Sequence, residues 1–218
     1  MFSKVLKQDG YSQSQADHTF IKHFPTGKII VLIAYVDDII LTGNHEEEMR
    51  RLKILLSKEF QIEDLGHLRY FLGMEVARSK EGNSVSQHKY VLDLLHETGM
   101  SGCKQVETPM DPNTKLISRT EEEADKGQYQ CLVGKLIYLR HTRLAISFSV
   151  GIVSQFLSNP SVDHMKVVIR ILRYLKKDPG KGLKFKKTLN RSLKVYIDAD
   201  WGGSPINGRS ISGYCSPL

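Results

Sequence analysis

The chain has 218 residues, of which 40% are hydrophobic and 25% are charged, so it has enough apolar material for a folded core and gross disorder is excluded. Its net charge of +7 indicates an anionic partner, most often a nucleic acid. The three cysteines, Cys103, Cys131 and Cys215, lack zinc-site spacing, and no apolar run is long enough to span a bilayer. We therefore expect an intracellular protein with reduced cysteines and no membrane partner.

The N-terminal residues predict a short helix followed by a strand hairpin. Residues 1–6 are typical of the end of a helix, which Gly10 terminates. The apolar run 28–35 predicts a buried strand, and 39–41 predicts the strand that returns beside it. The acidic segment 36–38 is then expected at the tip of a hairpin.

A helix is expected directly after this hairpin. Asn44 is predicted to cap it, with Glu47 three residues later as the capping-box partner. The acidic residues 46–48 would lie in the first turn, where the helix dipole favours negative charge. One face of this helix is expected to be buried, because apolar residues recur at helical spacing. These residues are Met49, Leu52, Leu56 and Phe60.

The middle of the chain predicts a second hairpin and another helix. Residues 70–76 alternate in polarity, which indicates one continuous strand. Residues 81–83 form the expected turn, and Val85 begins the returning strand. Residues 87–98 predict a helix that Gly99 ends.

A helical region follows the linker that we expect over residues 104–118. Apolar stripes predict helices over 129–139 and 143–157, and a third helix that Ser161 caps and Pro179 ends.

Two strands are predicted near the C-terminal end, over residues 183–186 and 193–197. Asp198 to Asp200 would close the second strand, and no further strand or helix is expected in the Gly- and Ser-rich residues that follow. Because the hairpins and the helices are segregated along the chain, we predict the α+β class.

Asp37 and Asp38 are the strongest candidates for chemistry. Adjacent carboxylates between apolar strands are costly to bury without a cation, although such a pair is also expected in an exposed turn. Mg²⁺ prefers hard oxygen ligands, and a two-metal site takes carboxylates from more than one segment. Asp9, Asp17 and Glu75 are the available third ligands, and none lies in a convincing position. The residues alone therefore predict half of a metal site.

Asp198 and Asp200 form a second candidate. They follow an apolar strand and precede a glycine turn, a position that suits a metal ligand and an ordinary turn equally.

Basic residues are concentrated between Met165 and Lys194, where eleven Lys or Arg accompany one acid, Asp178. A nucleic-acid backbone is the expected partner of such a run, and a solvated helix face is the alternative. The residues that we expect to contact the backbone are Lys176, Lys177, Lys181, Lys184, Lys186 and Lys187.

The segment YVDDIILTGN, residues 35–44, resembles reverse transcriptases, which carry Tyr-X-Asp-Asp at a hairpin tip. The wider sequence resembles the Pol polyprotein of copia-type retrotransposons over essentially all residues, with its segments in the same order. These segments are GYSQSQADHTF, FQIEDLGHLRYFLGMEV, SQHKYVLDLL, ETPMD, LVGKLIYL, SQFLSNPSVDHMKVVIRILRYLK, and DADWGG with GRSISGY.

The resemblance implies three parts. A partial polymerase palm of antiparallel hairpins and helices would occupy residues 1–80, a mostly helical thumb and connection 81–188, and the truncated start of a ribonuclease H-like domain 189–218.

The resemblance also implies roles for single residues. Asp37 and Asp38 would be catalytic and bind metal in the palm, and Asp198 would do the same in the ribonuclease H-like part. The residues implied in primer–template binding are Tyr35, Val36, Phe71, Leu72, Gly73 and Met74.

The implied activity is RNA-directed DNA polymerisation, with two Mg²⁺ ions, deoxynucleoside triphosphates and an RNA or DNA primer–template in the intact enzyme. In this family another metal-binding aspartate and the nucleotide-binding segment precede YVDD, so we expect this chain alone to be inactive. Leu144-Ala145 stands where the family usually has Pro-Asp.

The alternatives are a non-catalytic, basic nucleic-acid-binding remnant and a degenerate retroelement product. Self-association through an exposed palm surface, and a location in cytoplasmic virus-like particles or in the nucleus, are further expectations.

Overall fold

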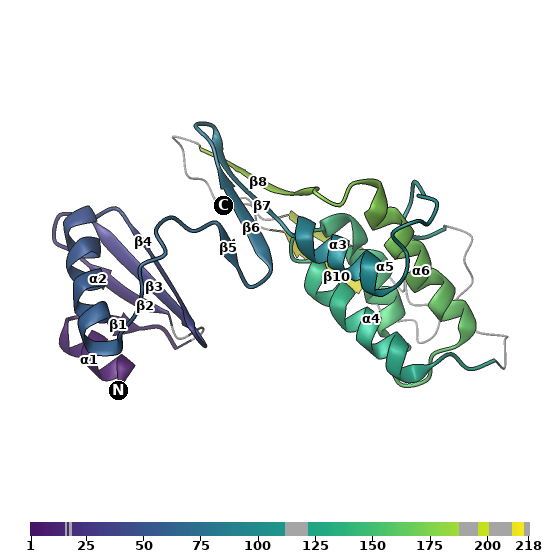
Figure 1. Cartoon of the computed structure of the whole chain (residues 1–218), viewed down its shortest axis with the longest axis horizontal. Helices are drawn as coiled ribbons and strands as arrows, with labels where there is room; N and C mark the ends of the chain where they lie inside the picture. Colours follow the sequence, from purple (N-terminus) through teal and green to yellow (C-terminus); the bar gives the residue numbers. More distant parts are fainter. Residues whose placement is uncertain (16, 18, 112–121, 188–195, 201–210, 216–218) are drawn as a thin grey trace. The chain divides into compact units, whose positions relative to one another are not determined.

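The computed structural model describes residues 1–15, 17, 19–111, 122–187, 196–200 and 211–215 (Figure 1). The chain forms two compact units, Met1–Phe71 and Leu72–Leu218.

The first unit is a four-stranded antiparallel sheet with two helices. The strands have the order β1-β2-β3-β4, and α2 lies along one face of the sheet (Figure 1). The elements are α1 (Phe2–Gln8), β1 (Ser12–Gln13), β2 (Phe20–His23), β3 (Ile29–Tyr35), β4 (Asp38–Gly43), α2 (Glu46–Phe60) and the short β5 (Tyr70–Phe71).

The core of this unit lies between the sheet and its helices. Ile30 and Leu32 of β3 are fully buried, together with Leu52 of α2. Successive strand residues point to opposite faces, so Val31 and Ile33 lie on the other face, and 37% of Ile33 is exposed. The predicted strand and helix are confirmed, but the strand is buried on one face only, because its continuous apolar run conceals a period of two.

The second unit has a helical core. Its helices are α3 (His88–Glu97), α4 (Lys126–Leu139), the 3₁₀ turn η1 (Leu144–Ile146), α5 (Ser147–Ser154) and α6 (Val162–Lys177). The stripe predicted over 129–139 is buried in this core. Ser161 caps α6 as predicted, in a capping box that His164 completes through Nδ1, which accepts from the Ser161 backbone N–H at 2.9 Å.

This unit also contains strands. An antiparallel sheet joins β6 (Met74–Arg78), β7 (Gly82–Ser86) and β8 (Gly182–Lys186), and β8 runs beside β7 although about a hundred residues separate them (Figure 1). A separate pair joins β9 (Tyr196–Asp200) and β10 (Ile211–Cys215).

Three local predictions are wrong. The N-cap of α2 is His45 and not Asn44, whose side-chain Oδ1 instead accepts from the Ile29 backbone N–H at 2.7 Å. The strand predicted over 70–76 is broken by a turn at Leu72 and Gly73, both of which have positive φ. A further strand, β10, does follow Asp200, because it finds a partner in β9.

Candidate functional site

The β3–β4 hairpin carries the predicted carboxylate pair on a tight turn. Tyr35 pairs with Asp38, which leaves Val36 and Asp37 as the two turn residues. Val36 has φ 51, and its side chain is 88% exposed. A positive φ is strained for a β-branched residue, and it is the conformation that the first central position of a type II′ turn requires. The hairpin therefore holds its tip in a costly conformation, as is common at functional sites.

Both carboxylates are exposed at this tip, so the placement matches the exposed-turn alternative. Within the described residues, neither Asp37 nor Asp38 forms a hydrogen bond or an ion pair through its side chain. Carboxylate oxygens are the hard ligands that Mg²⁺ prefers. By their chemistry these two exposed carboxylates could supply part of the ligand set of a magnesium ion.

An aromatic pair lies within the same unit. The rings of Tyr35 and Phe71 approach edge to face, with 6.5 Å between centroids, and Tyr35 is 53% exposed. The structure thus brings together two of the residues predicted to contact the primer–template.

Leu72, Gly73 and Met74 belong to the second unit, and tyrosines of α3 and α4 contact the turn at Leu72 and Gly73. The Tyr138 hydroxyl donates to the Leu72 carbonyl oxygen. A Cβ at Gly73 would lie 3.8 Å from the ring of Tyr90, and φ 75 also favours glycine there. The turn at Leu72 and Gly73 therefore packs against two tyrosines, Tyr90 and Tyr138.

The candidate third carboxylates have other partners. Asp9 pairs with Lys22 and Arg51, and Asp17 accepts from the Thr19 backbone N–H at 3.1 Å. Glu75 accepts from the backbone N–H of Lys89 at 2.8 Å. In the part of the chain that the structure describes, no three His, Cys, Asp or Glu side chains are grouped to hold a metal ion.

The acidic start of α2 contributes to an ion network that the sequence analysis missed. The Lys22 Nζ lies 2.8 Å from Glu48, and the Arg51 guanidinium contacts both Glu48 and Asp9. The hydrogen bond from Arg51 lowers the pKa of Glu48 to about 2. The only sequence signal for this ion network is the i, i+3 spacing of Glu48 and Arg51. Lys22 comes from β2, which is distant in the sequence.

The basic run divides into two sets with different surroundings. On α6, the Arg173 Nε and the Lys176 Nζ donate to the carbonyl oxygens of Lys104 and Cys103, each at 2.7 Å, and Lys177 pairs with Glu107. These cations hold the segment 103–108 against the helix. Lys176 and Lys177, which we expected to contact phosphates, thus have partners within the chain.

The second set lies after α6, where Lys181, Lys184, Lys186 and Lys187 are exposed. A buried arginine positions the start of this stretch: the Arg143 guanidinium donates to the carbonyl oxygens of Asp178 and Lys181, at 2.6 and 2.8 Å. Burial lowers the pKa of Arg143.

Asp198 and Asp200 lie within β9 rather than beyond its end. In the register of the β9–β10 pair, Asp198 is opposite Gly213 and Asp200 is opposite Ile211. The role predicted for Asp198 stays a prediction.

Two further findings concern the class of protein. Among the described residues, none of the helices combines the length and the apolar character needed to cross a bilayer. Cys103 and Cys131 are free thiols.

Residues 1–112 match the family model described as reverse transcriptase (RNA-dependent DNA polymerase). The chain therefore belongs to the reverse transcriptase family, in the branch found in copia-type Pol polyproteins. No solved structure matches the chain.

Several relatives specify the resemblance. The chain is 38% identical to the "Retrovirus-related Pol polyprotein from transposon RE1" of Arabidopsis thaliana, over 94% of this chain and 14% of that protein. It is 35% identical to the Pol polyprotein from transposon TNT 1-94 of Nicotiana tabacum, over 98% of this chain and 17% of that protein. An "Uncharacterized mitochondrial protein" of Arabidopsis thaliana is 35% identical over 86% of this chain and 78% of its own length. The chain thus spans about a seventh of the first polyprotein.

Proposed function

We propose that the β3–β4 hairpin presents metal-binding carboxylates for templated nucleotide addition, with Asp37 and Asp38 as the ligands. The observation that supports this proposal most strongly is the strained turn at Val36, which exposes both carboxylates and leaves them without a cation of the described chain. Membership in the reverse transcriptase family supports a primer–template and deoxynucleoside triphosphates as the substrates of this proposal.

The chemistry of the proposed site depends on Mg²⁺, which, when bound, would neutralise charge on the reacting phosphates. Asp37 and Asp38 would hold the ion, and Tyr35, at the strand end beside them, offers an exposed ring on which a base can stack. The Tyr35–Phe71 contact restrains that ring.

The β3–β4 hairpin supplies metal ligands from a single segment of the chain. Neighbouring residues of a strand point to opposite sides, and a pair of metal ions takes carboxylates from more than one segment. We therefore propose that a further segment completes the site, and that these 218 residues alone do not extend a primer.

Primer extension tests this proposal. The 218-residue chain and a chimaera, in which it replaces the matching stretch of a related Pol polyprotein, are assayed with labelled deoxynucleotide. We expect incorporation by the chimaera only, and a loss of at least about a hundredfold on Asp37→Asn, because a charged metal ligand is removed.

Asp93→Asn is the matched control, since Asp93 is an exposed carboxylate on α3 that pairs with Lys89. A chimaera with Asp37→Asn that keeps its activity would refute the role of the hairpin. Incorporation by the isolated chain that depends on Asp37 would refute the need for a further segment.

A second candidate function, nucleic-acid binding without catalysis, is favoured by the exposed lysines around β8. Such binding does not require Asp37 or a metal ion. Nucleic-acid binding that persists in the presence of a chelator therefore distinguishes it from polymerisation.

A further inference from the structure

One face of the sheet formed by β6, β7 and β8 carries two lysines and several small residues, together with Glu75, which pairs with Ser86. Residues that pair directly across antiparallel strands lie on the same face. Lys184 pairs with Ser84, which pairs with Ala77, and Lys186 pairs with Gly82. We call this surface the lysine face and define it by these five residues.

The opposite face of the same sheet is apolar around Val76 and polar towards Arg78, which pairs with Asn83. Val76 pairs with Val85, which pairs with Leu183, and all three side chains are partly buried. Within β8 the alternation is regular: Lys184 and Lys186 lie on one face, and Leu183 and Phe185 lie on the other.

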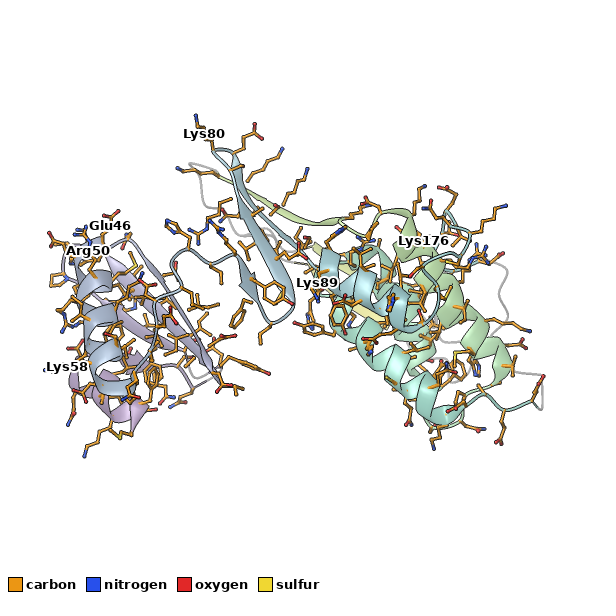
Figure 2. All side chains as sticks on the ribbon, in the orientation of Figure 1. Glu46, Arg50, Lys58, Lys80, Lys89 and Lys176 are labelled. Atoms are coloured by element: carbon orange, nitrogen blue, oxygen red, sulfur yellow. The ribbon has the colours of Figure 1, made fainter. Side chains whose placement is uncertain are left out.

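Charge on this sheet is strongly positive. Residues 74–86 and 182–187 contain five basic and two acidic side chains. One acid, Glu75, accepts a backbone N–H of α3, and the other, Glu81, follows Lys80 at the end of the hairpin (Figure 2).

The lysines of this face also differ from those of α6 in what they contact. Lys184 and Lys186 are exposed, and within the described residues neither has an ion pair, whereas Lys176 donates to the Cys103 carbonyl oxygen. An unpaired lysine loses no internal contact when a phosphate binds to it. The sheet is therefore better suited to an anionic partner than the helix is.

We propose that the lysine face binds the sugar–phosphate backbone of a nucleic acid. This proposal rests on the proposed function only for the kind of partner. The strand rise places Lys184 and Lys186 about 7 Å apart on one face, so they can contact successive phosphates of one strand. The hydroxyl of Ser84, which lies between them and Ala77, is a further phosphate donor.

Lipid is a poorer partner for this face. An interfacial protein segment inserts large apolar side chains beside its cations. Ala77, Gly82 and Ser84 offer none, so the lysine face provides charge without an apolar anchor.

Fluorescence anisotropy with a labelled RNA–DNA duplex tests the proposal, using the whole chain in EDTA over a range of salt concentrations. We expect Lys184→Glu/Lys186→Glu to weaken binding at least about tenfold at low salt and to reduce the slope of log K against log salt by about 2. The conservative Lys184→Gln/Lys186→Gln should show the same loss in slope with a smaller loss in affinity.

Lys4→Glu/Lys126→Glu is the matched control. It lowers the net charge of +7 by the same four units, at two exposed helical positions that are not part of the sheet. We expect this control to retain most of the wild-type affinity. An equal loss in both double variants, or wild-type binding by the sheet variant, would overturn the proposal, as would a lysine-dependent preference for phosphatidylserine vesicles over the duplex.

Failure of the proposed function leaves a different signature. If Asp37→Asn has no effect on primer extension, the proposed metal site at the hairpin is wrong. The binding measurements in EDTA still test whether the lysine face binds nucleic acid.

Discussion

Val36 shows what a single residue contributes to the candidate site. A β-branched residue is disfavoured at positive φ, yet Val36 adopts φ 51 between two strands that pair up to Tyr35 and Asp38. The strand pairing therefore dictates the turn conformation against the preference of the residue. The order of apolar and acidic residues predicted the hairpin, but it carries no signal for this strain.

Glu48 has the clearest dependence on pH. Its pKa in the folded chain is about 2, below the ordinary value of 4.5. A lowered pKa stabilises the fold above pH 4.5, and this stabilisation is lost as the pH falls from there towards 2. We expect Glu48→Gln to reduce the unfolding free energy by about 2 kcal/mol at pH 7, allowing for solvent screening at Arg51, and by much less near pH 2.

Thermal unfolding at a series of pH values measures this effect. Glu59→Gln is the control, because Glu59 is an exposed residue of the same helix. The same loss of stability at every pH in the Glu48 variant would contradict the ionic origin of the effect.

At the scale of elements, α6 shows how a basic helix can be misinterpreted. Its charge pattern predicted phosphate contacts, whereas Arg170, Arg173 and Lys176 donate to the segment 103–108. Charge density along a sequence does not reveal acceptors that come from about seventy residues away. The apolar stripe of the same helix depends only on local spacing, and it was predicted well.

Replacing Arg173 tests whether the cations of α6 hold the segment 103–108 against the helix. We expect Arg173→Met to destabilise the fold by about 1 kcal/mol, because it removes a charge-assisted bond to the Lys104 carbonyl oxygen. Amide hydrogen exchange over residues 103–108 should become faster.

Lys166→Met is the control on the same helix, since Lys166 pairs with Asp163 one turn earlier. Unchanged exchange over residues 103–108 in the Arg173 variant would show that the segment is held by other contacts.

At the scale of the whole molecule, the α+β class and most helices followed from periodicity, caps and turn residues. The partnership of β8 with β7 did not, because pairing between distant strands depends on tertiary packing and leaves no local pattern. The candidate site divides in the same way: Asp37 and Asp38 were evident from the sequence, while the partners of Asp9 and Glu75 required the structure. Self-association through the palm surface stays a prediction.

The central claim is that the hairpin tip binds a divalent cation. Titration of the ¹⁵N-labelled chain with Mn²⁺, a paramagnetic ion that carboxylate sites also accept, surveys every amide at once. We predict that the amides of residues 35–40 broaden first, that excess Mg²⁺ restores them, and that Asp37→Asn/Asp38→Asn abolishes the effect while Asp93→Asn does not. Broadening that persists in the double variant, or that is centred on another acidic segment such as residues 46–48, would contradict the account.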